Sequence, residues 1–127
     1  MKNKLILALS GNDIFSGGGL HADLTTYTVN GLHGFVAVTC LTAMIDKGFE
    51  VIPVEEEVFA QQLSSLKDVP FSAIKLGLLP NVEVADLALD YVKGMDIKWT
   101  VKIHVTQKHH INLNLICTRL MVQLQTR

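Results

Sequence analysis

A glycine-rich stretch near the start of the chain, residues 9–24, has the residue types of a small-molecule binding site. It reads LSGNDIFSGGGLHADL and joins an apolar run to a segment with helical spacing. In parallel α/β sheets, ligands bind at such junctions between a strand and a helix. Glycines allow close backbone approach, and N–H groups at a helix start suit an anion. Asn12 and Asp13 are best placed to hold a ligand, although an ordinary glycine-rich turn is the alternative.

Other ligand motifs are absent from the sequence. The glycine spacing is neither GxGxxG nor GxxxxGK[ST], so neither nucleotide fingerprint applies. The acidic run Glu55–Glu57 opens an expected helix, where acids favour the helix dipole, and we interpret it as a solvated helix start. His104, His109, His110 and Cys117 fit no standard zinc spacing. We therefore predict no metal site.

Alternating strand and helix patterns indicate how the stretch is positioned. We expect strands at 4–9, 34–41, 49–54 and 72–76, and helices at 20–30, 55–66 and 82–93. This order predicts an α/β fold, a parallel sheet flanked by helices. Pro53 marks the third strand as an edge or an excursion, and the structural alternative for Lys75 is a snorkelling edge lysine.

Composition limits the class of protein. The chain has 127 residues, enough for one domain, and 49% of them are hydrophobic. Its longest apolar run is too short for a membrane span, and the N-terminus lacks a small-residue cleavage site. We therefore expect a cytoplasmic protein with no membrane partner and with its two cysteines, Cys40 and Cys117, reduced.

The net charge differs sharply between the two sides of residue 96. Residues 1–96 hold six lysines and all twelve acidic residues, whereas 97–127 carry +5 and contain no Asp, Glu, Gly, Ala, Pro or Ser. We interpret 97–127 as a non-homologous, frameshifted tail, which the nucleotide sequence around codon 96 would test. The alternative is a natural basic tail with β-patterned runs such as 101–105. It lacks the dense Lys/Arg cluster of a nucleic-acid arm, so we expect no nucleic-acid partner.

Three segments in order resemble one family. SGNDIFSGGGLHADL, NGLHGFVAVTCLTAM and AIKLGLLP are similar to motifs of the bacterial pyridoxine/pyridoxal kinases and hydroxymethylpyrimidine (phosphate) kinases. These enzymes belong to the ribokinase-like superfamily, and the resemblance covers about residues 4–94. It implies the N-terminal portion of a ribokinase-like, Rossmann-like domain over 1–96. It also implies an ATP- and Mg-dependent phosphorylation of a hydroxymethyl group, in a homodimeric parent enzyme.

The resemblance also implies roles for particular residues. Gly11 and Asp13 resemble substrate-ring contacts, with Asn12 in place of the usual serine, and Met44 and Leu78 resemble side chains that line the ring pocket. Gly17, Gly18 and Gly19 resemble the glycines near the flexible lid.

The substrate follows from position 44. Hydroxymethylpyrimidine kinases typically carry a glutamine there, which bonds the amino-pyrimidine edge, and the methionine of this chain cannot. The sequence therefore favours pyridoxine or pyridoxal, with hydroxymethylpyrimidine (phosphate) as the alternative substrate. The family's catalytic G-[AS]-G-[CD] loop is not found, so no catalytic residue is assigned and we expect an inactive fragment. A non-catalytic α/β module that binds a small ligand is the second alternative.

Overall fold

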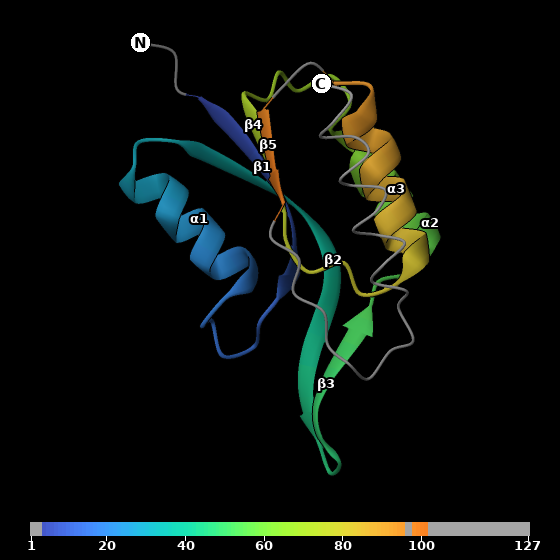
Figure 1. Cartoon of the computed structure of the whole chain (residues 1–127). Coiled ribbons are helices and arrows are strands. Elements are labelled where there is room, and N and C mark those ends of the chain that lie inside the picture. Colours follow the sequence, from blue (N-terminus) through green and yellow to red (C-terminus); the bar gives the residue numbers. More distant parts are fainter. Residues whose placement is uncertain (1–3, 96–97, 102–127) are drawn as a thin grey trace.

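The computed structural model describes residues 4–95 and 98–101. Five strands and three helices follow one another along this part of the chain, alternating except where β3 directly follows β2 (Figure 1). Their bounds are β1 (Leu5–Asn12), α1 (Gly19–Val29), β2 (His33–Ile45), β3 (Gly48–Pro53), α2 (Glu56–Ser65), β4 (Ala73–Leu76), α3 (Val82–Lys93) and β5 (Lys98–Val101).

The strands form one mostly parallel sheet in the order β3-β2-β1-β4-β5. β1 pairs in parallel with β2 and with β4, and β4 pairs in parallel with β5. β3 is antiparallel to β2 and lies at the edge of the sheet. The sheet confirms the predicted α/β class and the edge position of the strand that contains Pro53.

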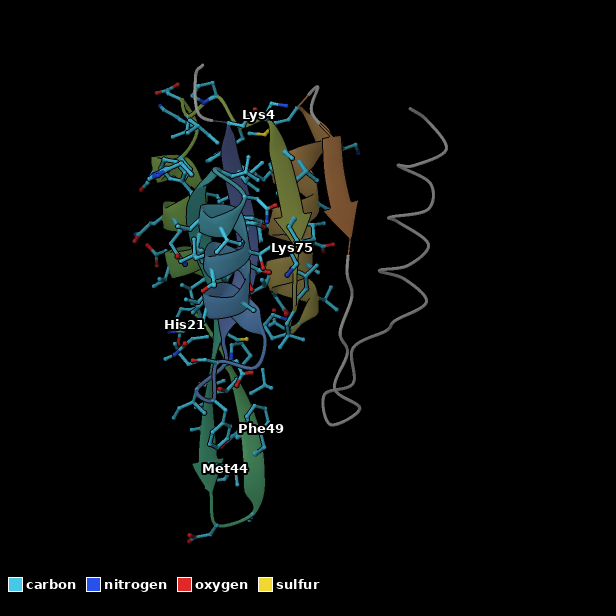
Figure 2. The ribbon with its side chains drawn as sticks, turned by 90° about the vertical axis from the view of Figure 1, so that its left-hand side faces the viewer. Lys4, His21, Met44, Phe49 and Lys75 are labelled. Atoms are coloured by element: carbon cyan, nitrogen blue, oxygen red, sulfur yellow. The ribbon has the colours of Figure 1, made fainter. Side chains whose placement is uncertain are left out.

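Helices cover both faces of the sheet. α1 lies on one face, and α2 and α3 lie together on the other (Figures 1 and 2). Successive side chains of a strand point to opposite faces. Leu7, Leu9, Ile74 and Leu76 belong to the buried cluster that includes the inner residues of α2 and α3. The alternate positions, such as Lys75, therefore face α1. The layer between the sheet and α2 and α3 is apolar, whereas the layer between the sheet and α1 also contains polar groups.

The first two strands are longer than the sequence predicted. β1 continues past Leu9 to Asn12, with a register shift between Ser10 and Asn12. β2 continues to Ile45 and pairs with β3 as a hairpin, and Gly48, which opens β3 directly after the turn, has a φ of 113°. The glycine stretch thus begins inside a strand, and the hairpin projects beyond the rest of the sheet (Figure 1).

The helices agree closely with the predicted ranges. α3 spans the predicted residues, and the side chain of Asn81 caps it by accepting a hydrogen bond of 2.9 Å from the Val84 N–H. α2 buries Phe59 and Leu63, whereas Val58 is exposed. No helix among the described residues is long and apolar enough to cross a membrane.

β5 changes the position of Lys75 in the sheet. Because β5 pairs with β4, the strand that holds Lys75 has a neighbour on each side and is not an edge. The interpretation of Lys75 as an edge lysine was therefore wrong. Most of the β-patterned run over 101–105, like the rest of the tail from residue 102 onward, lies outside the described residues.

One side chain of α2 completes the hydrogen bonding of β2. The Gln62 amide accepts from the Val38 N–H at 2.8 Å and donates to the Val38 carbonyl at 2.9 Å. β3 begins to pair with β2 only at Cys40, so Gln62 takes the place of a strand partner at Val38. The Gln62 side chain thus fixes α2 to the sheet at the point where the hairpin begins.

We expect Gln62→Leu to lower the free energy of unfolding by about 1–3 kcal/mol. The substitution leaves both the N–H and the carbonyl of Val38, which are partly buried, without their hydrogen-bond partner. Urea denaturation of the 127-residue chain measures this change. Gln61→Leu, at an exposed neighbouring position of α2, is the matched control. Equal effects of the two substitutions would contradict a structural role for the Gln62 amide.

Candidate functional site

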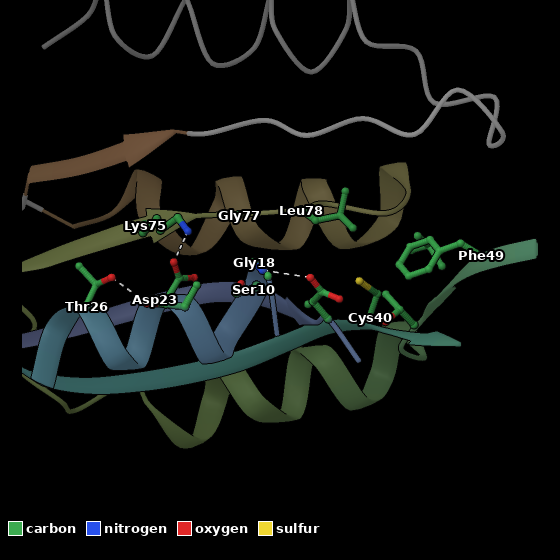
Figure 3. A pocket seen from close by; sticks show the side chains of 16 residues that line it. Ser10, Gly18, Asp23, Thr26, Cys40, Phe49, Lys75, Gly77 and Leu78 are labelled. Atoms are coloured by element: carbon green, nitrogen blue, oxygen red, sulfur yellow. Dashed lines mark hydrogen bonds and ion pairs between the residues drawn. The ribbon is translucent and has the colours of Figure 1, made fainter. Parts of the chain in front are cut away.

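A cavity of about 670 Å³ lies where β1, β2 and β4 end, beside the start of α1 (Figure 3). The glycine stretch supplies Gly11, Asp13 and Gly17–Gly19 to its lining, and Leu78 follows from the end of β4. These are most of the residues expected at the site. Asn12 and Met44 are not among the described residues that line the cavity, so their contact with a ligand stays a prediction.

Asp13 organises the glycine loop. Its carboxylate accepts hydrogen bonds of 3.0 Å from the Phe15 N–H through Oδ1 and from the Gly18 N–H through Oδ2. Gly18 is the N-cap residue of α1, so the negative charge lies at the positive end of the helix dipole. The chain's own carboxylate thus takes N–H groups that the sequence analysis left for a bound anion.

Gly19 permits the close contact between the loop and β1. Its φ of 66° is in the left-handed region, where side chains other than hydrogen are strained. A Cβ atom at Gly19 would also collide with the carbonyl oxygen of Gly11. The last glycine of the cluster is therefore required by backbone geometry.

Two threonines of β2 hold the rim of the cavity together. The Thr39 hydroxyl donates to the Leu78 carbonyl at 2.7 Å, which ties β2 to the end of β4. The Thr42 hydroxyl donates to the Asn12 carbonyl and accepts from the Ile14 N–H, both at 2.9 Å. These bonds fix three chain segments around one cavity, and neither hydroxyl bond was predicted from the sequence.

The outer part of the cavity is apolar. Phe49 and Val51 of the hairpin line it together with Leu78, and the ring of Phe15 stacks on Phe49 at a centroid distance of 6.5 Å. Cys40 also lines it, and burial raises the pKa of its thiol, so the thiol stays protonated at neutral pH. This surface suits a small planar ring.

The inner part of the cavity is polar. Lys75 of β4 forms an ion pair with Oδ1 of Asp23 on α1 (Figure 3). Burial, and secondarily the charge of Asp23, raise the pKa of Tyr27 to about 12.

Sequence reasoning missed Asp23, although a lysine within the apolar run AIKLGLL requires a buried counter-charge. That requirement is the signal that could have identified it.

The cavity does not resemble a metal centre. No group of three or more His, Cys, Asp or Glu side chains that could hold a metal ion occurs within residues 4–95 and 98–101. Its described lining contains a single basic side chain, Lys75, which Asp23 already neutralises. The described residues therefore fit a ring with polar substituents better than the phosphates of a nucleotide.

Comparison with known proteins gives a consistent result. The sequence model of a family described as phosphomethylpyrimidine kinase matches residues 13–108, which extends past the boundary expected at 96. The hydroxymethylpyrimidine/phosphomethylpyrimidine kinase of Haemophilus influenzae is 32% identical over 70% of this chain and 34% of its own length. The pyridoxine kinase of Bacillus subtilis is 30% identical over 72% of this chain and 35% of its own length. The chain thus spans about a third of these two relatives.

Solved structures share the fold. The pyridoxal kinase from Staphylococcus aureus in complex with pyridoxal matches with a TM-score of 0.74 and 28% identity, over 80% of this chain and 40% of that one. The same kinase in complex with ADP matches with a TM-score of 0.83 over 98% of this chain and 46% of that one, at 24% identity. The described elements correspond to the N-terminal part of that kinase fold.

Proposed function

The chain belongs to the phosphomethylpyrimidine kinase family, and from that premise we propose that it forms the substrate-ring half of a vitamin B6 kinase site. The reaction would be the ATP-dependent phosphorylation of the hydroxymethyl group of pyridoxine or pyridoxal. ATP and Mg²⁺ belong to this proposal, as does a homodimeric parent enzyme. The chain spans 34–35% of the two kinases compared above, so the whole activity is proposed and rests on the part of the site described here.

The shape and chemistry of the cavity carry this proposal. An apolar wall from Phe49, Val51 and Leu78 faces a backbone-rich loop, and a polar end lies deeper between α1 and the sheet. Ligand cavities commonly combine apolar walls with a few fixed polar groups. A pyridine or pyrimidine ring with polar substituents has the matching distribution of surface.

Each residue of the glycine stretch has a proposed role. Gly11 brings its backbone to the ring edge, and Gly17–Gly19 shape the loop beside it. Asp13 positions this loop through its two backbone hydrogen bonds, so it acts on the ring chiefly through the loop. Asn12 lies at the end of β1 and would contact the ring only from the rim. ATP would supply the transferred phosphoryl group.

Met44 faces the same side of the hairpin as the cavity. It lies opposite Phe49 in the antiparallel pair, and directly opposed residues share a face of the sheet. The next pair inward on this face, Thr42 and Val51, lines the cavity, as does Phe49. Met44 therefore lies one step outside the lining, at the rim near Phe49 (Figure 2). We propose that it contacts the outer edge of the ring.

We expect the chain to bind pyridoxine more tightly than 5-hydroxymethyl-aminopyrimidine. Met44→Gln should reduce the ratio of the two dissociation constants by up to about tenfold, because an amide can pair with the amino-pyrimidine edge. Isothermal titration calorimetry with both alcohols measures the two affinities. Ile45→Gln is the matched control, since Ile45 is exposed and lies on the opposite face of the hairpin.

The outcomes separate the candidate substrates. Tighter binding of the aminopyrimidine by the unsubstituted chain would favour hydroxymethylpyrimidine as the substrate, consistent with the relative from Haemophilus influenzae. Equal responses to Met44→Gln and Ile45→Gln would remove Met44 from the site. Binding of neither alcohol would overturn the proposed function.

A further inference from the structure

Two buried polar atoms of the cavity lack partners. Ser10 is 1% exposed and Asp23 is 7% exposed, and both line the cavity. Ser10 Oγ and Asp23 Oδ2 have no hydrogen-bond partner among the described residues, although Asp23 Oδ1 is held by Lys75. Leaving a buried polar group unpaired costs about 1–3 kcal/mol. Their shared position in one cavity indicates a ligand group that would pair with both.

Gly77 keeps Ser10 accessible. A Cβ atom at Gly77 would lie 3.2 Å from Ser10 Oγ and 3.0 Å from the Leu9 carbonyl oxygen. A side chain there would therefore crowd the strand and cover the hydroxyl. Ser10 and Gly77 both line the cavity, and both are labelled in Figure 3.

The donor and acceptor pattern of this inner part selects one ligand group. Asp23 Oδ2 only accepts, whereas Ser10 Oγ both donates and accepts. A ligand hydroxyl can donate to the carboxylate and accept from the serine at the same time. An amino group on an aromatic ring only donates, so it would leave the serine proton unpaired. An anionic ligand group would find no unpaired positive charge among the described lining residues, because Lys75 is already paired with Asp23.

We propose that Ser10 and Asp23 bind a hydroxyl substituent on the aromatic ring of the ligand and so determine which ring is accepted. This inference rests on the proposed function, since pyridoxine and pyridoxal carry a ring hydroxyl and hydroxymethylpyrimidine does not. Ser10 and Asp23 would then be a second determinant of substrate choice besides Met44, deep in the cavity. It also fixes the edge of the ring that faces the inner end.

The experiment measures the coupling between the two hydroxyl groups. Calorimetry compares pyridoxine with its deoxy analogue, in which hydrogen replaces the ring hydroxyl, on the 127-residue chain and on Ser10→Ala. We expect the unsubstituted chain to prefer pyridoxine by about tenfold and Ser10→Ala to lose most of this preference. Ser65→Ala, at an exposed position of α2, should keep the full preference.

The unfolding midpoint in urea is the second readout. Ser10→Ala removes no internal hydrogen bond, so its midpoint without ligand should equal or exceed that of the unsubstituted chain. A lower midpoint would show a structural role and overturn the inference. An equal preference for pyridoxine in both chains, or no preference in the unsubstituted chain, would overturn it while the proposed function stands. Binding of neither ligand would overturn both.

Discussion

The 127-residue chain should form no pyridoxal 5′-phosphate when it is incubated with pyridoxal and MgATP. Phosphoryl transfer requires positioned phosphates, a metal ion and stabilisation of the charge that develops on the transferred group. In the described cavity, Lys75 is neutralised by Asp23, and Asp13 occupies loop N–H groups. The described residues therefore add no phosphate site to the proposed ring site. Chromatographic detection of the product measures turnover, and binding of pyridoxal should persist.

Asp13→Ala is the matched control for this experiment. It removes the carboxylate that holds the glycine loop, so turnover that belongs to the chain should fall with it. A host kinase carried through purification would instead give the same rate in both samples. Turnover in the unsubstituted chain that disappears in Asp13→Ala would contradict our expectation and show that this chain alone completes the phosphate site.

Local patterns were sufficient to predict most of the fold. The apolar runs of β1, β2 and β4 alternate with helical segments, and only a parallel sheet with helices on its faces satisfies that order. Asn81 marks the start of α3, since an Asn side chain can cap a helix start. These signals depend on residues close together in the sequence.

The hairpin of β2 and β3 was harder to predict. The second strand was predicted to end at residue 41, yet it continues to Ile45 because β3 supplies a partner. Whether such a run ends or continues depends on tertiary pairing more than on intrinsic propensity. The longer hairpin also shapes the candidate site, because it brings Phe49 and Val51 to the cavity.

The glycine loop was predicted to bind a ligand and lies on a cavity, whereas the inner polar groups were not predicted. Glycine clusters and Asp13 act through neighbouring backbone, which sequence spacing reveals. Asp23 and Lys75 are 52 residues apart and meet because β4 pairs beside β1 under α1. Charge pairing across a sheet depends on strand order and register, which spacing alone does not determine.

That ion pair leads to the largest expected change in stability. Lys75→Met should lower the free energy of unfolding by about 3–5 kcal/mol, because it leaves the carboxylate of Asp23 buried without its partner. The side chain of Asp23 is only 9% exposed, so water cannot replace the ammonium fully. Small domains are stable by about 5–15 kcal/mol, so the loss would be a large fraction of the total. Urea denaturation followed by circular dichroism measures it.

The double variant Asp23→Leu/Lys75→Met separates the loss of the pair from the loss of a single charge. Replacing a buried ion pair by apolar side chains is often neutral or stabilising, so we expect it to recover most of the stability. Lys67→Met, at an exposed lysine after α2, should change stability by less than about 0.5 kcal/mol. If Lys75→Met were as mild as Lys67→Met, the carboxylate would have another partner. If the double variant were no more stable than Lys75→Met, the loss would come from packing of the lysine stem instead of from an unpaired charge.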